Sequence, residues 1–212
     1  MKFIATDVSD TREKMVGMAS AQLEHQGFAV DSYFYRSHVT YEAELENIIF
    51  KSWLYAGHIS QIANNGDYFL FDIGEDSIII NRDSNGEICV MHNICRHRGA
   101  RVVEEPSGNR RTFVCPYHGW AYSNDGSLKR AREMDQLAGF SCADYALKKI
   151  RFEVFHGMIF INCDPQAADF IGPLENITRQ LGAYDLTHAK VADAKTYRIN
   201  ANWKLCLENY LE

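Results

Sequence analysis

Two short segments of the sequence combine thiols and imidazoles in matched pairs. The first is Cys95-Arg96-His97, and the second, after 17 intervening residues, is Cys115-Pro116-Tyr117-His118. Each half supplies one Cys and one His, which suits two irons with different ligands, sulfur donors on one and ring nitrogens on the other. The pattern predicts a [2Fe–2S] cluster held by Cys95, His97, Cys115 and His118, and therefore one-electron transfer.

A structural zinc site is the alternative for these four residues. Two Cys and two His also satisfy tetrahedral zinc. Usual zinc pairs have spacings such as C-x₂₋₄-C and H-x₃₋₅-H, whereas each half here mixes one Cys with one His. The pairing by halves favours the iron–sulfur cluster.

Both ligand pairs are expected in loops at the ends of strands in a compact antiparallel β domain. Hairpin turns are predicted at Asn85-Gly86, Asp125-Gly126 and His156-Gly157, because residues of these types tolerate positive φ. Short segments of strand-forming residues, separated by turn signals, predict strands over residues 67–73, 77–82, 88–92, 111–114, 120–123, 149–155 and 158–162.

Helices are expected to flank this β domain. Apolar residues at three- and four-residue intervals predict a helix over 11–26, and Thr40 is the predicted cap of a second helix that ends before Trp53. Prolines then indicate a boundary near residue 165. A short helix over 174–181, a strand over 190–200 and a helix over 202–212 are predicted to follow.

The composition restricts the class of protein. Hydrophobic residues make up 46% of the chain and charged residues 24%, which is ordinary for a globular protein. The net charge of −6 argues against nucleic-acid binding. No signal-peptide core and no apolar stretch near twenty residues is present, so neither secretion nor membrane spanning is expected. Of the six cysteines, two are assigned to the cluster and the other four are scattered without framework spacing, which suits a reduced cytoplasm.

The segments from Cys95 to Ala100 and from Cys115 to Trp120 resemble those of the α subunits of Rieske non-haem iron oxygenases. The resemblance continues to Asn202-Trp203-Lys204 and covers roughly residues 30 to 212. Cytochrome bc-type iron–sulfur proteins, the other Rieske family considered, carry an additional cysteine in each cluster loop. Here Gly99 and Ala100 follow the first half and Tyr117 fills the second, so the resemblance favours the oxygenase and ferredoxin group.

The resemblance implies an O₂-dependent oxygenase. Its Rieske cluster would take electrons from a ferredoxin or flavin reductase and pass them to a mononuclear iron that hydroxylates or demethylates a small organic substrate, in a homotrimer. The implied fold class is α+β: an N-terminal helical segment (1–40), a mainly antiparallel β Rieske domain (41–165) and the beginning of an α+β catalytic domain (166–212). A stand-alone Rieske ferredoxin is the alternative, although residues 166–212 argue against it.

Two residues near the end of the sequence match the family's catalytic machinery. Glu212 matches the carboxylate that bridges the Rieske histidine of one subunit to the iron-binding histidine of its neighbour. Asn209 resembles the asparagine near the mononuclear iron, whose own ligands are expected beyond this chain. Glu at the bridge position resembles the quaternary-ammonium monooxygenases, which act on betaine- or carnitine-like compounds. Trp203 and Lys204 are interpreted as packing and surface residues.

Overall fold

The computed structural model describes residues 9–25, 27, 29–134, 137–170, 178–179, 184 and 186–211. The chain forms two compact units, one made of Met1–Lys51 with Ala194–Glu212 and the other of Ser52–Asp193. Antiparallel sheets make up the second unit and helices most of the first, which confirms the α+β class. The division of the sequence at residues 40 and 165 stays a prediction.

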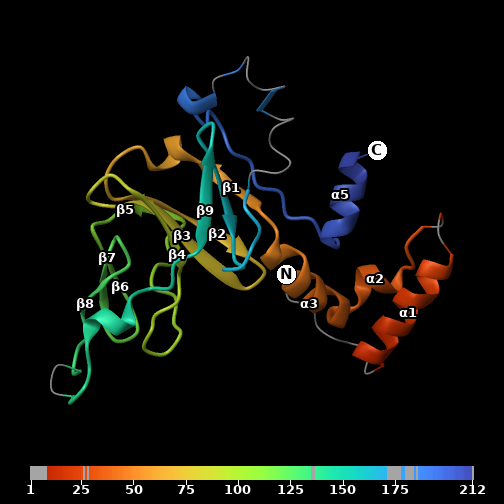
Figure 1. Cartoon of the computed structure of the whole chain (residues 1–212), viewed down its shortest axis with the longest axis horizontal. Coiled ribbons are helices and arrows are strands. Elements are labelled where there is room, and N and C mark those ends of the chain that lie inside the picture. The colour runs from red at the N-terminus through yellow and green to blue at the C-terminus, as the bar shows by residue number, and fades with distance from the viewer. Residues whose placement is uncertain are drawn as a thin grey trace. The chain divides into compact units, whose positions relative to one another are not determined.

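Three antiparallel sheets build the second unit (Figure 1). The first sheet has the order β1 (Leu54–His58), β10 (Met158–Asn162) and β9 (Arg151–Phe155). The second has the order β4 (Ile88–His92), β3 (Asp76–Arg82), β2 (Asp67–Ile73) and β5 (Ser107–Asn109). The third has the order β6 (Thr112–Val114), β7 (Ala121–Ser123) and β8 (Leu128–Arg130).

The predicted hairpin turns are confirmed. Gly86 lies between β3 and β4 and Gly126 between β7 and β8, each with a φ of 90°. His156 and Gly157 join β9 to β10 with φ values of 48° and 80°, the left-handed conformation that a tight hairpin requires. Strands β1, β5 and β8 are not predicted from the sequence; β5 and β8 have only three residues each.

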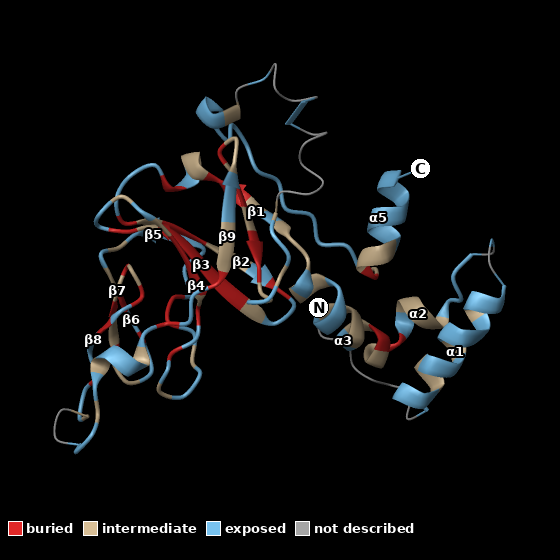
Figure 2. Cartoon of the chain, in the orientation of Figure 1, coloured by how far each residue is buried: buried red, intermediate tan, exposed pale blue. Residues whose placement is uncertain are grey.

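The core of the second unit surrounds the central strands of the four-stranded sheet. Ile78, Ile79 and Ile80 of β3 are each at most 1% exposed, so successive side chains on opposite faces are both covered. Figure 2 shows this concentration of buried residues along β3 and its neighbour β2. Cys95 and Cys115 belong to the adjoining buried cluster, so both predicted ligand loops are rooted in the core.

Four α-helices occur in the described part of the first unit: α1 (Arg12–Glu24), α2 (Tyr33–Arg36), α3 (His38–Asn47) and α5 (Trp203–Leu211). The helix predicted over 11–26 is confirmed as α1, and Thr11 caps it, with its hydroxyl accepting a hydrogen bond from Lys14 N at 3.3 Å. The predicted cap at Thr40 is wrong. α3 begins at His38 and its cap is Ser37, three residues before Thr40; the Ser37 hydroxyl accepts a hydrogen bond from Thr40 N at 2.9 Å.

A polar cluster connects α5 to α3 inside this unit. Lys204 Nζ lies 2.6 Å from Glu44 Oε1, and Trp203 Nε1 donates to Glu44 Oε2 at 2.9 Å. The Lys204 side chain is 17% exposed and its ammonium also lies 5.5 Å from the centre of the Tyr35 ring. The interpretation of Lys204 as a surface residue is therefore wrong, because a carboxylate and an aromatic face hold its charge inside the unit.

The C-terminal predictions have mixed outcomes. Residues 189–200 are exposed and form no strand, and no strand of the described residues pairs with them, so the strand over 190–200 is wrong. The helix over 202–212 is confirmed as α5, although Glu212 lies outside the described residues. The helix over 174–181 falls almost wholly outside them. Across the described part of the chain, helices are too short or too polar to cross a membrane.

Candidate metal centre

The two cysteine–histidine segments form loops with the same backbone hydrogen bonds. In the first, which follows β4, Cys95 N donates to Ala100 O at 2.8 Å and Gly99 N donates to Cys95 O at 2.9 Å. In the second, between β6 and β7, Cys115 N donates to Trp120 O at 2.8 Å and Gly119 N to Cys115 O at 3.0 Å. The chain thus presents two similar ligand loops. Glycine is needed in each because φ is 75° at Gly99 and 71° at Gly119.

These loops bring like side chains together. The thiols of Cys95 and Cys115 are 3% and 2% exposed and lie within hydrogen-bonding reach of each other. The rings of His97 and His118 are 4.7 Å apart between centroids. No three His, Cys, Asp or Glu side chains of the described residues converge on a single ion position. Two thiols and two imidazoles in separate pairs suit a two-iron cluster better than one zinc ion.

The histidine pair has the chemistry of a ligand pair. His97 Nδ1 is buried and has no hydrogen-bond partner within the described part of the chain. Burial lowers the pKa of His97, and the neighbouring His118 lowers it further, so the ring is neutral at pH 7. A neutral imidazole with a buried, unpartnered nitrogen has a lone pair free for a metal. These residues therefore fit the predicted group.

Hydrogen-bond donors surround both cysteine sulfurs. The backbone N–H groups of Tyr117 and His118 donate to Cys115, although burial of this thiol has the larger effect and raises its pKa. The Tyr122 hydroxyl lies 3.4 Å from Cys95 Sγ and accepts a hydrogen bond from Arg96 N at 3.0 Å. Because Arg96 N–H occupies a lone pair of the tyrosine oxygen, the hydroxyl proton is free to point at a Cys95 thiolate.

A buried asparagine fixes the path of the first loop. Asn93 is 0% exposed, and its Oδ1 accepts hydrogen bonds from Val102 N and Val103 N, both at 2.9 Å. Its Nδ2 donates to Val103 O at 2.7 Å and to Ser77 Oγ at 3.2 Å. One side chain thus joins both ends of the loop that carries Cys95 to strand β3.

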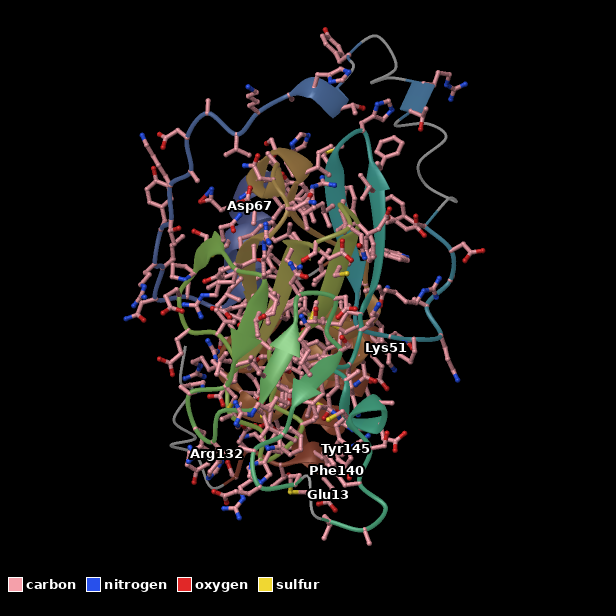
Figure 3. All side chains as sticks on the ribbon, turned by 90° about the vertical axis from the view of Figure 1, so that its left-hand side faces the viewer. Glu13, Lys51, Asp67, Arg132, Phe140 and Tyr145 are labelled. Atoms are coloured by element: carbon pink, nitrogen blue, oxygen red, sulfur yellow. The ribbon has the colours of Figure 1, made fainter. Side chains whose placement is uncertain are left out.

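An aromatic cluster packs against His97. The indole of Trp120 stacks on the His97 ring, with 5.0 Å between centroids and 12° between planes. Phe140 and Tyr145 each meet Trp120 edge-on and stack on one another at 4.7 Å, and Figure 3 shows them side by side. Because Trp120 is only 2% exposed, this packing holds the His97 ring in one orientation.

The arginines near the loops differ in how their charges are balanced. Arg110 pairs with Glu105 at 2.9 Å and Arg101 with Asp72 at 3.6 Å. Neither Arg96 nor Arg98 has a carboxylate within 4.0 Å among the described residues. Positive charge beside the first loop therefore remains available to other molecules.

The structure describes one of the two residues predicted to take part in catalysis. Asn209 is exposed on α5 and, with other residues of the first unit, lines an open hollow of about 600 Å³. The remaining residues that line the hollow are Ile199, Ala201, Leu205, Cys206 and Tyr210. Glu212, the second predicted residue, lies outside the described residues. Both roles stay predictions.

Sequence reasoning missed Asn93, Tyr122 and Trp120 as parts of the site. Tyr122 and Trp120 are two residues apart at the start of β7, so they share the inward face on which Phe113 also lies. That alternation was a usable signal. The role of Asn93 had no comparable signal, because its partners are distant backbone groups.

Comparison with known proteins agrees with this geometry. Residues 52–141 match the Rieske [2Fe-2S] domain family. The fold and the paired ligands thus define an iron–sulfur protein of the Rieske type, and the zinc alternative is not supported.

The chain contains a Rieske [2Fe-2S] domain and, over most of its length, is similar to oxygenase subunits of Rieske oxygenases. It is 36% identical over 188 residues to a glycine betaine monooxygenase oxygenase subunit of Pseudomonas aeruginosa, across 87% of this chain and 43% of that protein. It is 33% identical over 192 residues to a benzene 1,2-dioxygenase subunit alpha of Pseudomonas putida, across 88% and 42%. A crystal structure of a quaternary ammonium Rieske monooxygenase with L-carnitine superposes with a TM-score of 0.75 at 31% identity, across 85% of this chain and 52% of that one.

The chain therefore spans about half the length of these relatives, or slightly less. The relatives are oxygenase subunits, so the alternative of a stand-alone ferredoxin is not supported.

Proposed function

We propose that this chain is the cluster-bearing part of an oxygenase subunit, with Cys95 and Cys115 on one iron and His97 and His118 on the other. The observation that carries the proposal is the pairing of buried thiols with each other and of imidazoles with each other in two matching loops. When bound, such a cluster supplies a one-electron relay whose potential is raised by the neutral histidine ligands.

The protein's own residues have distinct tasks around the cluster. Tyr122 and the backbone N–H groups of the second loop donate hydrogen bonds to the ligand sulfurs, which stabilises negative charge there. Asn93 fixes the path of the first loop through its hydrogen bonds, and Trp120 keeps the His97 ring in place. Packing and hydrogen bonds thus hold the ligand residues in place, and hydrogen bonds to the sulfurs adjust the reduction potential of the cluster.

We further propose that the whole protein uses O₂ to hydroxylate or demethylate a small organic substrate at a mononuclear iron. A ferredoxin or flavin reductase would supply electrons, the subunits would form a homotrimer, and the location would be the cytoplasm. Glu212 would bridge the cluster of one subunit to the iron site of the next, with Asn209 near that iron. The similarity to glycine betaine and carnitine enzymes, together with Glu at position 212, favours a quaternary ammonium substrate.

The test uses the full product of the gene that encodes this chain, with its iron sites reconstituted. The reduced protein is exposed to O₂ with glycine betaine, with L-carnitine or with benzene, and products are measured after a single turnover. We expect oxidised product from a quaternary ammonium compound. Product from benzene alone would overturn the substrate class, and a reducible cluster with no product from any of the three would contradict the oxygenase assignment.

Replacing Tyr122 with Phe is expected to lower the reduction potential of the cluster while leaving its iron content unchanged. The lost hydroxyl stabilises charge on Cys95, and a difference of about 1 kcal/mol between redox states corresponds to a shift on the order of 40 mV for a one-electron couple. A potentiometric titration followed by visible absorbance measures the shift. Tyr68→Phe is the matched control, because Tyr68 is equally buried in the same core but packs on Phe113. Equal shifts in both variants would contradict the role of Tyr122.

A further inference from the structure

A hollow of about 240 Å³ lies beside the first ligand loop, within the second compact unit. Its lining residues are His92, Ile94, Arg96 and Lys148. Ile94 and Arg96 immediately precede and follow Cys95 in the chain. The hollow therefore adjoins the part of the first loop that carries Cys95.

Backbone hydrogen bonds fix the walls of this hollow. His92 N donates to Lys148 O at 2.9 Å, which ties the segment carrying Lys148 to the edge of β4. Arg96 N donates to the Tyr122 hydroxyl at 3.0 Å, which anchors the segment carrying Arg96 to β7. The two cationic side chains that line the hollow thus extend from fixed main-chain positions.

The hollow carries positive charge without internal compensation. Within the described part of the chain, Arg96 and Lys148 have no carboxylate closer than 4.0 Å. Burial lowers the pKa of His92. The negative charge of Asp76 raises it, but this effect is the smaller of the two. The whole chain has a net charge of −6, so the hollow differs in sign from the protein around it.

Its other lining groups suit a carboxylate on an apolar stem. The side chain of His92 also lines the hollow, but its Nδ1 is buried and out of reach of an incoming group. Ile94 is 37% exposed at the rim and offers an apolar contact. Two cations and one aliphatic side chain together suit the side chain of Asp or Glu.

We propose that this hollow is where an acidic electron-donor protein docks, with one of its carboxylates seated between Arg96 and Lys148. The proposal rests on the proposed electron-transfer function. The donor loses one electron and the cluster gains one, and no bond forms or breaks.

The test measures how fast the reconstituted full chain is reduced in a stopped-flow instrument by an acidic plant-type [2Fe–2S] ferredoxin, which has a lower potential than a Rieske cluster. We expect Lys148→Glu to slow the bimolecular rate about tenfold at low salt and Lys148→Gln to slow it less, because charge complementarity accelerates encounter. The difference is expected to vanish near 0.5 M salt, where charges are screened within roughly 5 Å. Lys190→Glu, an exposed charge reversal outside the hollow, is the matched control.

Reduced methyl viologen, a small cation, separates docking from electron transfer itself. Equal reduction by viologen in all four proteins shows that the cluster is intact, and selective slowing by ferredoxin then supports docking in the hollow. Equal slowing in Lys148→Glu and Lys190→Glu, or no slowing in Lys148→Glu, would overturn the docking site. Failure of viologen to reduce the unmodified protein would instead overturn the proposed function. Binding of inorganic phosphate that depends on Lys148, with unchanged ferredoxin rates, would assign the hollow to a small anion and also overturn docking.

Discussion

Cys115→Ser is expected to reduce bound iron and acid-labile sulfide to below about a tenth of the unmodified level after anaerobic reconstitution. The thiolate is the ligand that iron–sulfur clusters require, and serine offers a harder, far less acidic oxygen in its place. Cys115 is 2% exposed and its thiol lies within hydrogen-bonding reach of Cys95, the other predicted sulfur ligand. Iron and sulfide analysis, with electron paramagnetic resonance of the reduced protein, measures the loss.

Cys89→Ser is the matched control for this prediction. Cys89 lies on β4 and is 7% exposed, so the same chemical change is made at another buried cysteine of the same unit. Burial raises the pKa of Cys89, which keeps it a neutral thiol. We expect this variant to keep its full cluster and to lose only a modest amount of stability. Retention of iron in Cys115→Ser, or equal loss in Cys89→Ser, would refute the ligand assignment.

Much of the β framework is predictable because its signals are local. The bounds of β2, β4 and β10 agree with the sequence prediction, and Asn85-Gly86 marks the turn that joins β3 to β4. The strand predicted over 190–200 shows where this reasoning ends. The apolar residues Tyr197 and Ile199 alternate with polar ones, yet they are 77% and 61% exposed. Alternation defines a face, but a strand also needs a neighbour to accept its backbone hydrogen bonds.

The candidate site also has a part that the sequence predicts and a part that it does not. The ligand residues are predictable because Cys and His at close spacing have few other chemical uses, and each pair lies within a single loop. The groups that hold these ligand residues in place are not predictable from the sequence. Lys148 reaches the hollow beside Cys95 only because its segment pairs with β4, and Asn93 acts through backbone groups that any residue would offer. Contacts of this kind depend on the tertiary fold rather than on residue type.

Asn93→Ala is the second prediction with a large effect, and we expect it to lower the free energy of unfolding by about 4 kcal/mol. The asparagine side chain makes four hydrogen bonds, and its removal leaves Val102 N and Val103 N buried without their partners. Each unsatisfied buried group costs roughly 1–3 kcal/mol, and the small cavity adds to this. Both valines are 1% exposed, so water cannot reach these groups unless the loop opens. Urea unfolding followed by circular dichroism measures the change.

If Asn93 holds the ligand loop closed, its removal affects the cluster as well as the stability of the fold. Because the loop carries Cys95 and His97, we expect Asn93→Ala to lose its cluster faster than the unmodified protein when a chelator is present, in addition to being less stable. Asn65→Ala is the control, since Asn65 is exposed and its side chain donates one hydrogen bond, to Ser84 O at 3.0 Å. That change is expected to cost about 1 kcal/mol or less and to leave cluster retention unaltered. A loss of stability in Asn93→Ala without faster cluster loss would show that the asparagine supports the fold but does not hold the ligand loop.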